Sequence, residues 1–176
     1  MNVLVTYKSK TGFTKKYAEW IARELSANII ECVGIKREIL SNYEVIIFGG
    51  SLHAVGIEGK KLITQNIDIL KNKNLIVFAV GASPFRKEIV TEIINKNFSQ
   101  EEQKYIHFYY LRGGFNYNKL PFFDKILMKL LQLKLKRKKA LTPDEKGMLN
   151  AYKKPVDFTR KENIKKIITH VRSLKR

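Results

Sequence analysis

The chain has 176 residues, of which 44% are hydrophobic and 28% charged, a composition that excludes a disordered or fibrous protein. Its formal net charge is +18, and residues 105–176 carry most of it, with 19 basic and 5 acidic side chains. A basic half of this kind indicates an anionic partner: nucleic acid, an anionic membrane surface or an acidic protein. A single cysteine, Cys32, excludes an internal disulfide and a cysteine-rich zinc site.

The sequence also bears on localisation. The longest segment without a formal charge, Val45 to Ile57, has 13 residues and is too short to cross a bilayer. Residues 1–7 have the pattern of a strand and not of a basic and then apolar signal segment. We therefore expect a cytoplasmic protein.

Short apolar runs alternate with amphipathic segments along most of the chain. Strands are predicted at residues 2–7, 29–33, 44–49, 75–80 and 105–111, and helices at residues 14–25, 59–70, 86–97 and 160–174. This alternation predicts a single α/β domain over residues 1–176, in which a doubly wound parallel sheet of five strands has helices on both faces. Right-handed crossovers favour the strand order 2-1-3-4-5.

One segment, residues 113–153, interrupts the alternation between the fifth strand and the last helix. It is much longer than the usual connection of about two to six residues, so we interpret it as an insertion. Its first part predicts a helix from Pro121 to Lys136, because proline suits the first helical turn. The polar residues of this helix recur at helical spacing and leave a wide apolar arc; they are Lys125, Lys129, Gln132 and Lys136. The insertion is thus basic and amphipathic.

The turn after the first strand carries the strongest chemical motif, Ser9-Lys10-Thr11-Gly12-Phe13-Thr14. A helix N-terminus presents unpaired N–H groups and can bind a phosphate without a cation. The three hydroxyls can add hydrogen bonds, and the glycine lets the backbone approach a ligand closely. The alternative is that a Ser or Thr side chain simply caps the helix. Three hydroxyls and a glycine within six residues exceed what one cap needs.

Two further turns follow the third and fourth strands, at the edge where ligands of doubly wound sheets bind. The first comprises Ser51, Leu52, His53, Ala54, Val55 and Gly56, and the second comprises Gly81, Ala82, Ser83, Pro84 and Phe85. Small residues there would let a planar ring lie against the backbone, although both segments are also compatible with ordinary tight turns. His53 could face such a ring or lie exposed with no special role.

With these three turns the chain resembles the flavodoxin family, whose version of the first loop holds the phosphate of FMN. The resemblance implies a flavodoxin-like fold and noncovalent FMN, with the phosphate on Ser9 to Thr14 and the ring between the other two turns. Residues 111–117 and 123–131, with Val156-Asp157-Phe158, are similar to flavodoxin-type, quinone-dependent protoporphyrinogen oxidases. That similarity implies oxidation of protoporphyrinogen IX, or of a similar reduced substrate, in heme biosynthesis with a membrane quinone as acceptor. Flavin chemistry belongs to the cofactor, so no catalytic acid, base or nucleophile is assigned.

Several alternatives stay open. A basic flavodoxin could carry electrons between acidic redox proteins without turning over a small substrate. More distantly, residues 134–139 could bind nucleic acid, although that run lacks interleaved aromatic side chains for stacking. Residues 121–139 could contact an anionic membrane surface, or their apolar arc could pack on the protein itself or on a second copy. The three histidines show no metal-ligand spacing, so no metal site is predicted.

Overall fold

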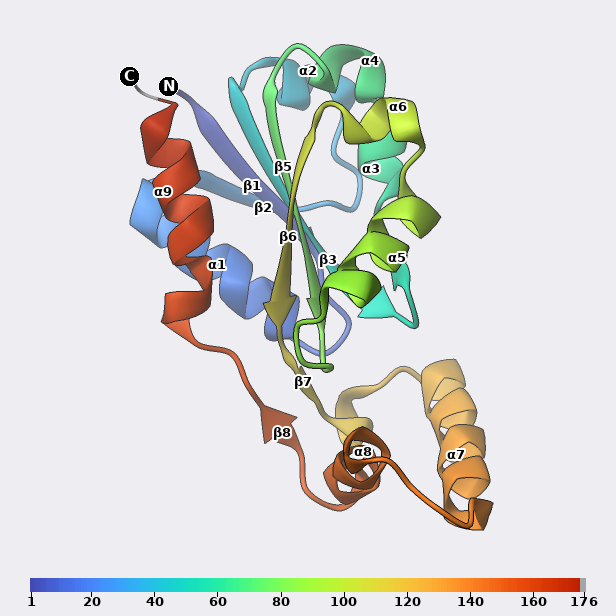
Figure 1. The fold of residues 1–176 in the computed structure, drawn as a ribbon. Helices are drawn as coiled ribbons and strands as arrows, with labels where there is room; N and C mark the ends of the chain where they lie inside the picture. Colours follow the sequence, from blue (N-terminus) through green and yellow to red (C-terminus); the bar gives the residue numbers. More distant parts are fainter. Residues whose placement is uncertain (175–176) are drawn as a thin grey trace.

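The computed structural model describes residues 1–174, apart from the side chain of Asp144 (Figure 1). A parallel sheet lies at its centre, built from β1 (Val3–Lys8), β2 (Asn28–Glu31), β3 (Val45–His53), β5 (Asn74–Gly81) and β6 (Ile106–Arg112). The strand order is β2-β1-β3-β5-β6, and the two-residue strand β4 (Gly56–Ile57) pairs with β3 outside this path. The five parallel strands therefore have the predicted order 2-1-3-4-5, and the predicted fold class is confirmed.

Helices cover both faces of this sheet, as predicted (Figure 1). One face carries α1 (Phe13–Leu25) and α9 (Lys165–Ser173), the latter preceded by a short 3-10 turn, η2 (Lys161–Ile164). The other face carries α2 (Arg37–Ser41), α3 (Lys61–Thr64), α4 (Ile67–Leu70), α5 (Lys87–Asn97) and α6 (Gln100–Gln103).

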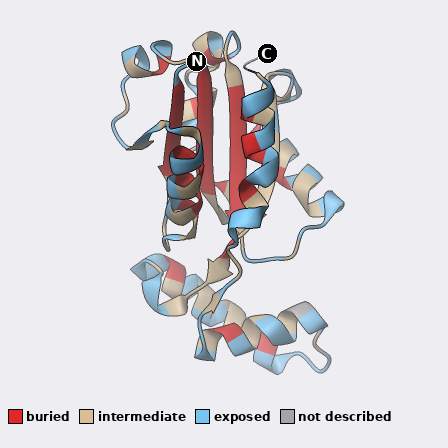
Figure 2. Cartoon of the chain, turned by 90° about the vertical axis from the view of Figure 1, so that its left-hand side faces the viewer, coloured by how far each residue is buried: buried red, intermediate tan, exposed pale blue. Residues whose placement is uncertain are grey.

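The central strands β3 and β5 are nearly continuous apolar runs because both of their faces are covered (Figure 2). Alternate side chains point to opposite faces of the sheet. Ile47 and Phe78 pack with α1 and α9, whereas Ile46 and Val77 pack with the helices of the other face. The sheet therefore has a hydrophobic core on each face. The edge formed by the carboxyl ends of its strands belongs to neither core and is where a ligand could bind.

The prediction of one continuous helix at residues 59–70 is wrong. The segment contains two four-residue helices, α3 and α4, separated at Gln65 and Asn66. The Asn66 backbone leaves the helical region, with φ −123° and ψ 17°, and its side-chain amide donates to the Leu62 carbonyl at 2.8 Å. Asparagine competes with helical hydrogen bonding in this way, which ends the first helix.

The insertion lies beyond the carboxyl ends of the sheet strands (Figure 1). It comprises β7 (Gly114–Phe115), the 3-10 turn η1 (Tyr117–Lys119), α7 (Phe122–Arg137), α8 (Pro143–Lys153) and β8 (Val156–Asp157). Helix α7 matches the helix predicted from Pro121 to Lys136, whereas α8 was not predicted. Strands β7 and β8 pair antiparallel, so the insertion leaves and rejoins the domain at neighbouring positions.

Candidate functional site

The structure brings the first two predicted turns together at the carboxyl edge of the sheet. Ser51, two residues before the end of β3, accepts a hydrogen bond from the Lys10 N–H at 3.3 Å, and its hydroxyl lies 2.8 Å from the Thr14 hydroxyl. Thr14 is fully buried, so its hydroxyl serves this contact in the structure. Ser51 thus holds the first turn by hydrogen bonds. It can do so because β1 and β3 are paired, which brings the segments that follow them together.

Helix α1 begins without a side-chain cap. Its cap residue is Gly12, whose φ of 95° is a left-handed conformation that glycine adopts without strain. The Ser9 hydroxyl accepts from the Gly12 N–H at 3.1 Å, which shapes the turn itself. Within residues 1–174, the N–H groups of Phe13, Thr14 and Lys15 have no acceptor. The simple-cap alternative is therefore wrong, and the first turn of the helix has donors without an acceptor, which suit a phosphate.

The side chain of Lys10 turns from this helix N-terminus toward two carboxylates. Its Nζ lies 3.0 Å from Glu58 and 2.9 Å from Asp124, the latter on the first turn of α7. Burial opposes the charge of the ammonium group, but the two carboxylates outweigh burial and raise the pKa of Lys10 above its ordinary value. Sequence reasoning missed Glu58 and Asp124, and no local pattern could have revealed a contact between residues 114 positions apart.

The segment from Ser51 to Gly56 is a β-hairpin and not an ordinary tight turn after the third strand, the alternative that the sequence left open. Strand β3 continues through Leu52 and His53, which pair with Ile57 and Gly56 of β4. Ala54 turns the chain with a φ of 53°. The buried amide of Asn97 on α5 holds the hairpin: it accepts from the Ile57 N–H at 2.8 Å and donates to the Val55 carbonyl at 2.7 Å.

The turn from Gly81 to Phe85 is held by the neighbouring strand β6. The Tyr110 hydroxyl donates to the Ser83 carbonyl at 2.6 Å, and Arg112 Nε donates to the Ala82 carbonyl at 3.3 Å. Burial raises the pKa of Tyr110 to about 12, so this phenol remains a donor at neutral pH. Phe85 is 66% exposed, and its ring centroid lies 6.4 Å from that of Tyr110. The turn therefore offers an exposed aromatic face on a fixed backbone.

His53 and Asp124 connect the insertion with the hairpin. Asp124 is buried, and its Oδ1 lies 3.6 Å from Nδ1 of the exposed His53. Its other oxygen binds Lys10, so one carboxylate contacts both the first turn and the hairpin. The sequence predicted a separate amphipathic insertion, whereas the structure places the start of α7 against the candidate site.

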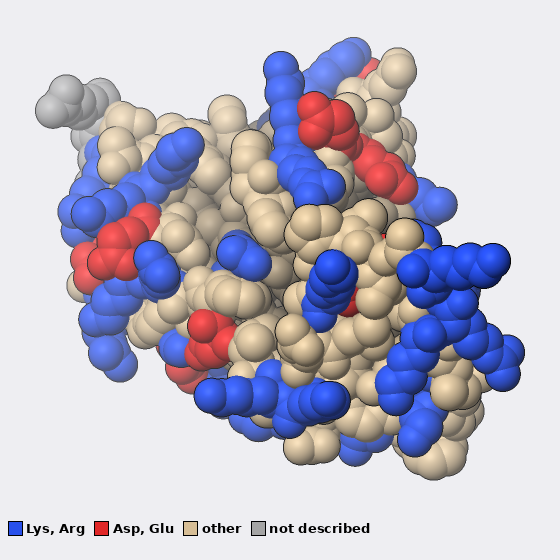
Figure 3. Space-filling model, turned by 60° about the horizontal axis from the view of Figure 1, so that its bottom comes forward, with Lys and Arg blue, Asp and Glu red and all other residues tan. Residues whose placement is uncertain are grey.

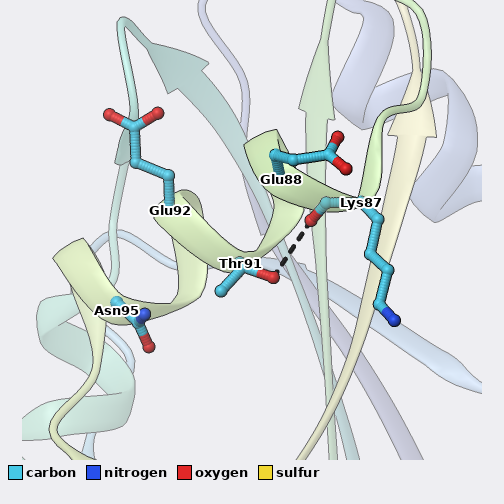
Figure 4. Close-up of a pocket in the computed structure, with 5 residues that line it drawn as sticks. All are labelled: Lys87, Glu88, Thr91, Glu92 and Asn95. Carbon is cyan, nitrogen blue, oxygen red and sulfur yellow. Dashed lines mark hydrogen bonds between the residues drawn. The ribbon is translucent and has the colours of Figure 1, made fainter.

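A surface hollow elsewhere lacks this convergence of elements. It runs along the exposed side of α5 and is lined by Lys87, Glu88, Thr91, Glu92 and Asn95 (Figure 4). Thr91 donates to the Lys87 carbonyl of the same helix at 3.0 Å. In the part of the chain that the structure describes, no group of three or more His, Cys, Asp or Glu side chains could hold a metal ion. The three turns therefore remain the candidate site.

The family model of the flavodoxin domain matches residues 4–142. The chain belongs to this family. The match includes the sheet, the three turns and the helix α7, but not α9. None of the described helices is long and apolar enough to cross a membrane.

An uncharacterized protein of Methanocaldococcus jannaschii is 33% identical to this chain over 91 residues, which cover 51% of this chain and 60% of that protein. The chain therefore matches only about three fifths of the length of this relative. Among solved structures, the Trp repressor binding protein of Bacillus subtilis is 20% identical with a TM-score of 0.48, covering 65% of this chain and 85% of that one.

A flavodoxin from the domain Archaea is 18% identical with a TM-score of 0.43 and covers 64% of this chain and 85% of that one. A flavoprotein of Lactobacillus acidophilus in complex with FMN is 17% identical with a TM-score of 0.43 and covers 63% and 91% of the two chains. At these identities the likeness concerns the fold.

Proposed function

We propose that this protein is an FMN-binding oxidoreductase of the flavodoxin family. The observation that carries the proposal is the uncapped start of α1, where Gly12 has a left-handed backbone and three successive N–H groups have no acceptor among the described residues. A phosphate monoester placed there would satisfy these donors and the positive end of the helix dipole. Its position directly after β1 is where doubly wound folds bind ligands.

The other two turns suit an isoalloxazine ring. The hairpin at Ser51–Gly56 is fixed by Asn97, and the turn at Gly81–Phe85 is fixed by Tyr110 and Arg112, so both walls are preorganised. The exposed Phe85 offers a face against which a planar ring can lie. Bound FMN would supply hydride or single-electron transfer, while these residues bind and orient it.

For the substrate, we propose protoporphyrinogen IX or a similar reduced compound, with a membrane quinone as electron acceptor. Support comes from the similarity of the insertion sequence to quinone-dependent protoporphyrinogen oxidases. The position of α7 beside the three turns adds to this support, because the insertion can then contribute to binding a substrate at the flavin.

FMN binding is tested by titrating the apoprotein with FMN and following flavin fluorescence. Gly12→Ala should weaken binding at least about tenfold, because a side chain strains the left-handed backbone that aims the donors. Gly34→Ala is the matched control, since Gly34 also has a positive φ, of 75°, and equally open space at its Cβ position, but lies between β2 and α2. Equal FMN affinity of both variants would contradict the phosphate assignment.

The substrate is tested separately, by anaerobic porphyrin fluorescence with FMN-loaded protein, protoporphyrinogen IX and a menaquinone analogue. We expect fluorescence to grow only when protein and quinone are both present. No growth, with FMN bound and reducible, would exclude the porphyrinogen proposal. It would favour an electron carrier for acidic redox proteins, consistent with the basic charge of residues 105–176.

A further inference from the structure

Helix α7 carries an unusual concentration of exposed hydrophobic side chains. We name as the apolar stripe Phe122, Phe123, Ile126, Leu127, Leu130 and Leu133, whose exposed fractions lie between 44% and 77%. Their spacing of one, three and four residues puts them on one side of the helix. The opposite side carries the buried Asp124 and Leu135, and there α7 meets Lys10 and α8. A narrow side of the helix thus packs on the protein while the broad side faces outward.

Cations lie along one border of the apolar stripe and at its C-terminal end. Lys125, Lys129 and Lys136 recur at helical spacing along one border, and Lys134 and Arg137 lie at its C-terminal end. Lys138 pairs with Glu145 at 2.8 Å, whereas the other cations of residues 125–139 have no carboxylate partner among the described side chains. Lys and Arg predominate over Asp and Glu on the end of the molecule that carries the insertion (Figure 3).

We infer that the apolar stripe of α7 docks on an anionic lipid surface, with the helix lying along the interface. Six bulky aliphatic and aromatic side chains, bordered by cations that have no carboxylate partner among the described side chains, fit the boundary between acyl chains and anionic headgroups. A second copy of the chain fits less well, because pairing two stripes would bring two sets of cations close together. The exposed apolar stripe and the cations that border it thus both favour an anionic lipid surface.

Docking in this way fixes the orientation of the whole domain. Asp124, on the first turn of α7, binds Lys10 of the first turn after β1, so the stripe and the three turns belong to the same end of the molecule. The carboxyl edge of the sheet would therefore face the bilayer. The inference goes beyond the proposed function, since it requires neither FMN nor a substrate.

The experiment is co-sedimentation of the full chain with phosphatidylcholine vesicles that contain or lack phosphatidylglycerol. We expect binding to the anionic vesicles, weakening as salt is added, and much weaker binding to the neutral ones. The double variant Leu127→Glu, Leu130→Glu should abolish binding. Ile29→Glu is its control, because Ile29 is a 38% exposed hydrophobic residue within β2, outside the insertion and before the carboxyl edge of the sheet.

The contribution of charge is tested with Lys129→Gln, Lys136→Gln. Binding should weaken about fivefold for each lysine removed, as expected for cations close to an anionic surface. The control pair Lys36→Gln, Lys71→Gln makes the same charge change beside α2 and α4, at the opposite end of the sheet (Figure 1), and should bind like the unaltered protein.

Three outcomes would overturn the inference. Binding that survives Leu127→Glu, Leu130→Glu would exclude the stripe, and equal losses in the two lysine pairs would exclude a local cationic border. Stripe-dependent dimers in size-exclusion chromatography, without vesicle binding, would assign the stripe to a second copy. None of these results bears on FMN binding, so failure here is distinguishable from failure of the proposed function.

Discussion

The sheet and the insertion are stabilised in different ways. The sheet has two buried cores, and residues 45–50 and 75–80 are buried without interruption. In the insertion, from Gly114 to Asp157, the residues described as buried are Asp124, Leu135 and Ala151 (Figure 2). Polar contacts attach it to the rest, chiefly Lys10 with Asp124 and Lys16 with Asp157.

This difference shows that hydrophobic burial builds the domain, whereas a few specific polar contacts position the insertion. A unit with so small a core of its own depends on those contacts or on a further partner. Its local stability should therefore be lower than that of the sheet, and it should respond to changes that leave the sheet intact.

The largest expected difference comes from the same substitution made in each region. Phe78→Ala, at a fully buried position in β5, should lower the free energy of unfolding by about 3–5 kcal/mol through lost burial and a cavity. Phe123→Ala, on α7 with Phe123 77% exposed, should change it by less than about 0.5 kcal/mol. Urea unfolding followed by circular dichroism measures both. Similar losses in the two variants would contradict the contrast.

A smaller effect is expected from Asp124→Asn, which weakens the contact between α7 and Lys10. Hydrogen bonds to charged groups typically contribute about 1.5–3 kcal/mol, and Glu58 remains as a partner of Lys10, so a loss of about 1.5 kcal/mol is expected. Amide hydrogen exchange should speed up in α7 and α8 but not in β3 or β5. Uniformly faster exchange throughout the chain would show that the insertion and the sheet unfold together.

The smallest effect concerns pH. Burial opposes the Asp157 carboxylate, but hydrogen bonds from Lys16 and Thr159 outweigh it and hold the pKa of Asp157 below its ordinary value. A lowered pKa contributes stability above the unfolded value near 4, and that stability is lost as pH falls through the folded pKa. Because Asp157 and Lys16 are both substantially exposed, the contribution should stay under about 1 kcal/mol.

Hydrogen exchange of β7 and β8, corrected for intrinsic rates, should therefore show less protection as pH falls from about 5 toward 3. Asp157→Asn should remove this pH dependence and leave the exchange of β5 unchanged. A variant that kept the full pH dependence would assign it to another group.

The sheet could be predicted because each of its strands is a short apolar run that is recognisable from its own residues. The uncharged runs of β3 and β5 and the amphipathic pattern of α1 need no distant information. Helix α8 was not predicted, although the sequence carries a local signal for it: Thr142 and Glu145 form a capping box with Pro143 at the first position.

The candidate site was predictable only in part. The first turn could be predicted as a phosphate site because its motif lies within six consecutive residues. Its contacts with Glu58 and Asp124 could not be predicted, because they join segments that are distant in the sequence. Likewise, Asn97 and Tyr110 hold the second and third turns from other elements of the fold. The hairpin was missed because its turn residue is Ala54, which is untypical of a left-handed position.

The pairing of β7 with β8 has a consequence for how such a chain can change over generations. Gly114 lies opposite Asp157 and Phe115 opposite Val156, so the chain leaves the domain and returns to it through a single pair of adjacent strands. Closing a loop across so short a gap costs little more for a long segment than for a short one. Residues 116–155 can therefore be lengthened, exchanged or reduced to a hairpin without re-threading a strand of the sheet. A lineage can therefore alter the surface that the insertion presents while keeping the sheet and its three turns unchanged.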